Sequence, residues 1–407
     1  MENTIKPSQD DNRPIDWGNV VFLTLSPLVA VFGTAWYVWA YGFSWWDVSI
    51  WLTMHFLTSV AITGGYHRYY SHRAYDCSRP VQLFYMIFGA ATLQNSVLNW
   101  SSDHRYHHRF VDQDEDPYNI NKGAFYAHMG WIFYKDTRDP GRRFENSPDL
   151  LKDPLVIWQH KYYLPLAIAV SFVLPALLGL LIGRPLGGLL WGGFVRCVIV
   201  HHTIFLINSA AHIIGTQPYD LSGSARDSWL LAPITFGEGY HNFHHKFQAD
   251  YRNGHRWWHF DITKWWINSL SWTGHAWRLR RTPESLILKA QLEVEKQLVA
   301  ERLAATSASE KMEQKISARL AAGARRLEEA HHSYLTAKAE YRHRYEEWTA
   351  DVRRQWQDKL AANRADYETA LSRWRLTMRA MNRLPQPSAS GLLSMSLVMD
   401  VLKHRVF

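Results

Sequence analysis

Residues 46–72 read WDVSIWLTMHFLTSVAITGGYHRYYSH, an apolar segment that ends in two histidines, His67 and His72. No Asp, Glu, Lys or Arg stands between residues 48 and 66. About 20 consecutive apolar residues are enough for a helix to cross the hydrocarbon core of a bilayer. Neutral imidazole is also the commonest metal ligand in proteins. The segment therefore predicts a transmembrane helix that carries metal-binding side chains to one membrane surface.

Three further segments have the same apolar character, and four transmembrane helices are predicted in all. Their predicted ranges are 18–41, 46–66, 161–183 and 186–212. The turns within each pair are short, whereas the stretch 67–160 between the pairs contains many Lys and Arg. Because basic loops stay in the cytosol, we expect a multi-pass protein of the cell inner membrane or the endoplasmic reticulum. Both termini and the active site would then be cytosolic.

The segment 80–102 is equally free of charged residues, yet it is not predicted to span the membrane. A span there would place His72 and His104 on opposite faces of the bilayer. We therefore expect an in-plane or re-entrant helix over this segment.

Two HxxHH motifs add six histidines to the first pair. In this motif the histidines stand at positions i, i+3 and i+4, which share one face of a helix. A ninth histidine follows Asn208 by four residues on the last predicted span. The predicted metal ligands are His67, His72, His104, His107, His108, His212, His241, His244 and His245.

The ligand set indicates the kind of metal centre. Nitrogen ligands without thiolates suit zinc, copper, iron or nickel, and the only cysteines are Cys77 and Cys197. Nine ligands are too many for a structural zinc ion, which takes four. Two ions beside an apolar cavity favour oxygen activation by a pair of irons. Asn208 is predicted to hold a metal-bound water through its amide oxygen.

Carboxylates near the motifs are predicted to orient the rings. A ligand histidine commonly donates its second N–H to a carboxylate, which fixes the orientation of the ring. Asp103 and Glu238 each lie within three residues of a motif and are the preferred acceptors. The further candidates are Asp112, Asp114 and Asp116.

These motifs resemble those of the membrane fatty acyl-CoA delta-9 desaturases of the stearoyl-CoA desaturase type. The resemblance covers about residues 17–280 and includes the spacing between motifs. It is carried by His67-Arg-Tyr-Tyr-Ser-His72, Asp103-His104-Arg-Tyr-His107-His108-Arg-Phe, Asn208-Ser-Ala-Ala-His212 and Gly237-Glu-Gly-Tyr-His241-Asn-Phe-His244-His245. It implies four spans, a cytosolic cap holding two irons, and O2-dependent removal of two hydrogens from an acyl chain.

The resemblance also implies roles for particular residues. The nine histidines would be the iron ligands, with Asn208 acting through water. Contacts to the acyl thioester and to CoA would fall near Asn95, Trp100, Asp103 and Lys135. Ser102 and Phe205 stand where the animal enzymes carry an arginine and a tryptophan. An acyl-lipid substrate therefore remains an alternative to acyl-CoA.

The electrons for this reaction would come from a separate protein. The sequence contains no His-Pro-Gly-Gly haem motif, no dinucleotide-binding glycine motif and no iron–sulfur cysteine set. We expect a cytochrome b5, or a ferredoxin with its reductase, as the donor, and no nucleic-acid partner. One alternative is a membrane hydroxylase of a lipid or alkane that uses the same metal pair. A metal transporter is disfavoured, because transporters bind ions near the bilayer midplane.

The predicted fold class is an all-α integral membrane protein with four spans, a helical cytosolic cap and a long helical tail. Six apolar residues of the tail recur every three or four positions and predict one apolar helix face: Tyr341, Tyr345, Trp348, Val352, Trp356 and Leu360. One or two long helices are predicted here, and they are interpreted as a coiled coil with a partner or with a second copy of the chain, or as a solvated appendage. The predicted segments are 1–16 (N-terminal tail), 17–282 (desaturase domain), 283–384 (helical extension) and 385–407 (flexible end).

Six tryptophans follow the third histidine motif, between residues 257 and 277. Amphipathic indole rings favour the headgroup layer of a membrane. The alternative is that they form the core of the cap.

Overall fold

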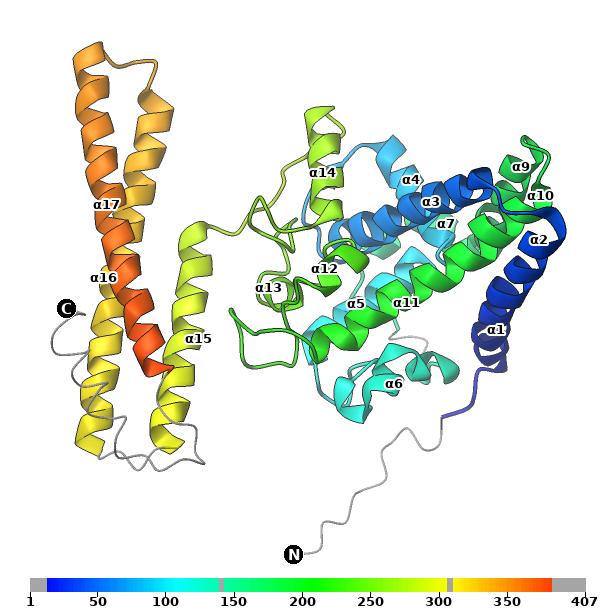
Figure 1. The fold of residues 1–407 in the computed structure, drawn as a ribbon, viewed down its shortest axis with the longest axis horizontal. Helices are drawn as coiled ribbons and strands as arrows, with labels where there is room; N and C mark the ends of the chain where they lie inside the picture. Colours follow the sequence, from blue (N-terminus) through cyan, green and yellow to red (C-terminus); the bar gives the residue numbers. More distant parts are fainter. Residues whose placement is uncertain (1–12, 139–142, 306–309, 383–407) are drawn as a thin grey trace, which may run out of the picture. The chain divides into compact units, whose positions relative to one another are not determined.

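The computed structural model describes residues 13–138, 143–305 and 310–382, and the chain divides into two compact units. Unit 1 comprises Met1–Gln217 with Ser222–Arg281, and unit 2 comprises Pro218–Leu221 with Thr282–Phe407. In the described ranges both units are built mainly of helices (Figure 1), and one small sheet pairs β1 (Asp76–Cys77) with β2 (Ala276–Trp277). The segment 385–407, predicted to be flexible, lies outside the described residues.

Unit 1 contains four helical segments long and apolar enough to cross a membrane, so the prediction of four spans is confirmed. They cover Trp17–Tyr41, Trp45–Ser71, Tyr163–Leu180 and Pro185–His212. Their elements in order are α1 (Trp17–Leu28), η2 (Val29–Gly33) and α2 (Thr34–Tyr41); α3 (Trp45–Val60) and η3 (Ala61–Ser71); α8 (Tyr163–Ile168), η7 (Ala169–Val173) and α9 (Leu174–Leu180); α10 (Pro185–Gly187), η8 (Gly188–Val195), α11 (Arg196–Asn208) and η9 (Ala210–His212).

An ion pair connects the two hairpins of spans at their short turns. Arg184, in the turn before α10, lies 2.9 Å from the carboxylate of Asp47 in the first turn of α3. The same guanidinium donates to the backbone oxygen of Gly42 at 2.8 Å. Asp47 is buried, and burial of a lone charge is costly. The pair therefore holds the loops after α2 and α9 in a fixed relation.

The apolar stretch 80–102 forms two helices, α4 (Arg79–Ala90) and α5 (Val97–Phe110), so the prediction of a single helix there is wrong. Between them the backbone takes left-handed conformations at Leu93 and Asn95, with φ of 55° and 80°. Such residues end a helix. Ser96 then starts α5 by accepting the N–H of Asn99. The left-handed residues therefore separate α4 from α5.

Helix α4 packs tightly against η3, the last part of the second span. Gly89 of α4 faces the ring of Tyr66, and Gly65 of η3 faces the ring of Tyr85. A Cβ atom at Gly89 would lie 2.3 Å from Tyr66. Both tyrosines are fully buried in the main apolar core of unit 1. The two glycines therefore allow α4 to lie directly beside the segment that carries His67.

The tryptophans after the third motif are mostly exposed rather than buried in the cap. Trp257, Trp258, Trp265 and Trp272 expose 83, 57, 43 and 84% of their surface. These values favour the headgroup interpretation over the cap-core alternative.

The remaining elements of unit 1 are η4 (Ile120–Lys122), α6 (Ala124–His128), η5 (Gly130–Phe133), η6 (Leu150–Lys152), α7 (Pro154–Lys161), α12 (Leu231–Ile234), α13 (His241–Lys246) and α14 (Ile262–Trp272).

The described part of unit 2 is a bundle of three helices, α15 (Glu284–Ala305), α16 (Glu310–Arg344) and α17 (Ala350–Met381). Their apolar faces pack on one another, with Leu327 and Met381 fully buried. Trp374 of α17 donates its indole N–H to Glu295 of α15 at 2.5 Å. The long apolar face of α16 is therefore satisfied within the unit.

The six apolar residues from Tyr341 to Leu360 do not form one helix face, which corrects the prediction. The chain turns between Arg344 and Ala350, so the six residues lie on two helices and the turn between them. Trp348 in the turn stacks on Trp356 of α17, with ring centroids 4.9 Å apart. The regular spacing thus continues across a hairpin, in which Trp348 buries its ring against the next helix whereas Tyr345 stays exposed. Self-association through this segment stays a prediction.

Candidate metal centre

The nine predicted ligand histidines come together in two groups. Within each group, the ring nitrogens that could bind an ion lie within 4.8 Å of one another. The five-ring group consists of His67, His72, His104, His108 and His244, and the four-ring group of His107, His212, His241 and His245.

The π-helical end of the second span explains why a spacing of five suits the first motif. In a π-helix each N–H bonds to the carbonyl five residues earlier. The N–H of His72 donates in this way to the carbonyl of His67, at 3.2 Å. The two rings therefore lie on one face, with centroids 4.9 Å apart.

The two HxxHH motifs each lie on a helix but divide their rings between the groups. On α5, His104 and His108 join the five-ring group, whereas His107 joins the four-ring group. On α13, His244 joins the five-ring group, and His241 and His245 join the four-ring group. Each helix thus contributes to both groups, which fixes the two positions relative to each other.

The rings point their Nε2 atoms at one another. Nε2 of His67 and His244 lie 2.9 Å apart, and those of His72 and His104 2.8 Å apart. In the four-ring group, Nε2 of His241 lies 3.1 Å from those of His212 and His245. Two facing nitrogens share at most one proton, and several converging lone pairs need a cation between them. The donor set therefore fits a metal ion in each group.

Several rings have their second nitrogen held by a neighbour. Nδ1 of His67 lies 2.9 Å from Glu238, and Nδ1 of His107 lies 2.9 and 3.0 Å from the two oxygens of Asp116. Nδ1 of His104 lies 3.2 Å from the hydroxyl of Tyr118. The two carboxylates accept, so they place a proton on Nδ1 of His67 and of His107 and leave Nε2 of these rings free for a metal.

His212 reaches a carboxylate through a serine. Its Nδ1 lies 2.7 Å from the hydroxyl of Ser224, which donates to Asp112 at 2.6 Å. Among the described residues, Nδ1 of His108, His241 and His244 is buried without a hydrogen-bond partner.

Six of the rings outside the spans are held neutral. Burial lowers their pKa well below the usual value, and the neighbouring rings lower it further. This holds for His72, His104, His108, His241, His244 and His245. A neutral imidazole is the form that binds metal.

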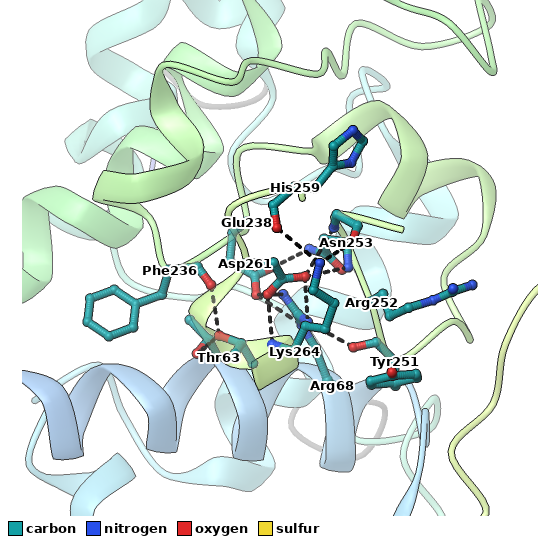
Figure 2. A network of polar contacts seen from close by, with 12 residues as sticks. Thr63, Arg68, Phe236, Glu238, Tyr251, Arg252, Asn253, His259, Asp261 and Lys264 are labelled. Atoms are coloured by element: carbon teal, nitrogen blue, oxygen red, sulfur yellow. Dashed lines mark hydrogen bonds and ion pairs between the residues drawn. The ribbon is translucent and has the colours of Figure 1, made fainter. Parts of the chain in front are cut away.

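Glu238 belongs to a buried network around Arg68 (Figure 2). Arg68 donates to Glu238 at 2.9 Å, to both oxygens of Asp261 at 3.0 and 3.1 Å, and to the carbonyl of Tyr251 at 2.8 Å. Burial raises the pKa of Glu238, but Arg68 and His67 outweigh it and bring the pKa below its usual value. Asn253 also donates to Glu238, at 2.5 Å. Glu238 is therefore an ionised acceptor held in place from several sides.

The other predicted site residues have varied surroundings. Trp100 stacks on His104 with ring centroids 4.9 Å apart. Asp103 pairs with Arg138 and not with a histidine ring. The carboxylate that contacts Nδ1 of a ring on α5 is instead Asp116, beside His107.

Asn95 stands in the turn before α5, where its N–H donates to the hydroxyl of Tyr163. Lys135 is exposed and donates its backbone N–H to Pro14. Asn208 ends α11, and its water-mediated role stays a prediction.

Sequence reasoning missed the residues that support the rings from a distance. Arg68, Tyr118, Ser224 and Asp261 had not been singled out. For Arg68 a signal existed, because it directly follows a predicted ligand at the end of an apolar span. Charged residues in such segments are rare and usually functional.

Comparison with known proteins agrees with this geometry. The family model for fatty acid desaturase matches residues 43–282. A probable acyl-CoA desaturase of Schizosaccharomyces pombe is 40% identical over 292 residues, which are 71% of this chain and 60% of the relative. Acyl-CoA desaturase 1 of Saccharomyces cerevisiae is 41% identical over 246 residues, 60% of this chain and 48% of the relative. The chain thus spans only about half to three fifths of these two yeast proteins.

Stearoyl-CoA desaturase 5 of Homo sapiens is 36% identical over 296 residues, which are 69% of this chain and 85% of that protein. The matched range 43–282 contains the second, third and fourth spans and all nine histidines. This chain is an integral membrane protein that belongs to the fatty acid desaturase family.

Proposed function

We propose that this protein is a membrane acyl-CoA desaturase that introduces a double bond into a saturated acyl chain, of the delta-9 type. The observation that carries the proposal is the five-and-four arrangement of inward-facing histidine nitrogens beside four apolar spans. It is supported by the similarity to proteins named acyl-CoA and stearoyl-CoA desaturases. Asn95, Trp100, Asp103 and Lys135 are proposed to contact the substrate near its thioester and carrier group.

The proposed metal is a pair of irons, held by the nine histidines and by Asn208 through water. When bound, the pair supplies the oxidising power of O2 that an unactivated methylene group requires. The protein supplies neutral nitrogens, the carboxylates that orient them, and apolar surroundings for the acyl chain. In the balanced reaction, O2 takes two hydrogens from the chain, two electrons from a donor and two protons from water, and leaves as two water molecules.

The donor is proposed to be a separate cytochrome b5, or a ferredoxin with its reductase. The histidine groups and both termini are proposed to face the cytosol, because the basic residues between the second and third spans favour that side.

Product analysis tests the proposal. The protein is expressed in desaturase-deficient cells, and the fatty acid methyl esters are analysed by mass spectrometry for position of unsaturation. A new monounsaturated product that His107→Ala abolishes and the exposed control His343→Ala retains is expected. A hydroxylated product would instead identify a hydroxylase. Purified protein without iron, or a product that persists in His107→Ala, would refute the proposal.

A further inference from the structure

The two histidine groups lie in different electrostatic surroundings. Each group contains one ring whose Nδ1 meets a buried carboxylate directly, His67 with Glu238 and His107 with Asp116. The two carboxylates are nearly alike in distance and burial, with side-chain exposures of 2 and 1%. What differs is the charge that surrounds them.

On the five-ring side, the carboxylates are balanced by cations. Glu238 and Asp261 share the guanidinium of Arg68, whose side chain is 1% exposed. Lys264 is also buried, its backbone N–H donates to Asp261 at 2.8 Å, and its ammonium group donates to three carbonyls (Figure 2). Two carboxylates and two cations make this network neutral.

On the four-ring side, the carboxylates have no such balance. Asp116 accepts from His107 and from the backbone N–H groups of Asp112 and Tyr118. Asp112 accepts the N–H and the hydroxyl of Ser224, which in turn contacts His212. Within the described ranges, no arginine or lysine forms an ion pair with Asp116 or Asp112. This side therefore lacks the paired cations that stand beside the carboxylates of the five-ring side.

These charges act on a metal through the rings. A carboxylate that accepts the Nδ1–H of a ligand ring makes the ring more basic, and such contacts tune the redox potential of the metal. A cation that shares the carboxylate weakens this effect. Charges are poorly screened in a buried site.

We propose that Arg68 and Lys264 make the two metal positions unequal, so that the five-ring position is reduced first and the four-ring position is held in the higher oxidation state. The inference rests on the proposed function, because it takes iron to fill both positions. Arg68, Lys264 and Asp261 are then positioning residues that act on the metal through Glu238 and His67.

The test is a redox titration of the full-length protein loaded with isotopically enriched iron and followed by Mössbauer spectroscopy. Two ferric signals of equal area are expected, and one should be reduced before the other. The reduction potentials of the two irons should differ by at least about 59 mV, which for a one-electron step is a tenfold difference in the reduction equilibrium. This difference is called the separation. Because two equal irons in close proximity would also be reduced stepwise, two charge-removing variants assign the signals.

Asp116→Asn and Glu238→Gln each remove one negative charge while keeping an oxygen that can accept the Nδ1–H. Asp116→Asn should raise the lower potential and narrow the separation. Glu238→Gln should raise the higher potential and widen the separation. The reverse pattern, or equal shifts of both signals, would overturn the inference.

Arg68 itself is tested by a matched pair of substitutions. Arg68→Gln should lower the higher reduction potential and narrow the separation between the two potentials. Arg68→Lys keeps the charge and should retain most of that separation. If Arg68→Gln or Glu238→Gln does not fold, Asp116→Asn decides the question alone, since an unchanged or wider separation there contradicts the inference. Protein without iron would refute the proposed function and this inference together, whereas fully loaded protein with equal irons would refute this inference only.

Discussion

At the scale of single residues, Arg68 is expected to matter more for stability than any exposed arginine. Arg68→Met would leave Glu238 and Asp261 buried without their cation, and breaking a buried pair in this way costs about 3–5 kcal/mol. The matched control is Arg278→Met, which removes an exposed pair with Asp76. Such surface pairs contribute about 0–1 kcal/mol. Chemical unfolding in detergent micelles measures both, and equal losses in the two variants would contradict the assignment of Arg68 as a buried anchor.

Asp227 is predicted to make stability depend on pH. Burial raises the pKa of Asp227 to about 7, although the N–H of Phe243 in α13, which its carboxylate accepts at 2.9 Å, opposes this rise. An unfolded aspartate has a pKa near 3.9. Between about pH 4 and 7 the folded protein therefore binds more protons than the unfolded chain, and its unfolding free energy falls as the pH rises.

Asp227→Asn keeps an oxygen for Phe243 and carries no charge at any pH. We therefore compare the unfolding free energy of the variant with that of the unsubstituted protein. The difference should shift in favour of the variant by about 1–3 kcal/mol between pH 5 and pH 8. Unfolding measured at several pH values checks this. A stability difference that stays constant over this range would show that Asp227 is already ionised in the folded protein.

Six of the nine rings were predictable because helical spacing places i, i+3 and i+4 on one face, and the other three because they stand at the ends of apolar spans; both signals are local. The residues that orient the rings follow no local rule. Arg68 meets Asp261 across nearly two hundred positions of the chain, and Ser224 joins His212 to Asp112 from a separate loop. Such contacts depend on how elements pack, so spacing along the chain could not predict them. For the same reason Asp103, although adjacent to His104, turns to Arg138 instead.

At the scale of elements, the spans were predictable because length and lack of charge suffice to define them. The π-helical form of η3 was not, because its extra residue per turn leaves no mark in hydropathy. It nevertheless explains the five-residue spacing between His67 and His72. The division of 80–102 into α4 and α5 was also missed. Leu93 and Asn95 have a left-handed backbone there, but neither is a glycine, the residue that usually indicates this conformation in a sequence.

The contact of α4 with η3 gives a prediction at this scale. In Gly89→Ala the new methyl group would meet the ring of Tyr66, which directly precedes His67. We expect a net loss of about 1–3 kcal/mol from overpacking, together with reduced iron content, because α4 must move away from the segment that holds the ring. Thermal unfolding and elemental analysis of purified protein measure the two effects.

Leu83→Ala is the control for this experiment, because Leu83 lies on the exposed side of the same helix. It should change neither quantity appreciably. If Gly89→Ala were as stable and as rich in iron as the Leu83 variant, the close approach of α4 to η3 would not be needed to form the site.

At the scale of the whole molecule, every residue that holds or orients the histidine rings belongs to unit 1. The nine rings, Glu238, Asp116 and the Arg68 network all lie between residues 63 and 264. Unit 2 has an apolar core of its own, made by α15, α16 and α17. Apart from the short segment Pro218–Leu221, which belongs to unit 2, the residues that form the centre are therefore separate in the sequence from those that form the three helices.

Deleting residues 283–407 should consequently leave a protein that inserts into membranes, binds as much iron as the full chain and yields the same unsaturated product. The truncation keeps the strand pair of β1 with β2 and the bond from Arg280 to Ala74, which close unit 1 after its last helix. Iron content and product are measured beside the full-length protein, with His107→Ala in both backgrounds as the inactive reference. If the truncated protein is inserted and loaded with iron yet makes no product, the helical extension takes part in turnover itself. The most direct test of that outcome is whether activity returns when an artificial reductant replaces the protein donor, because restored activity would place the role of the extension in electron delivery.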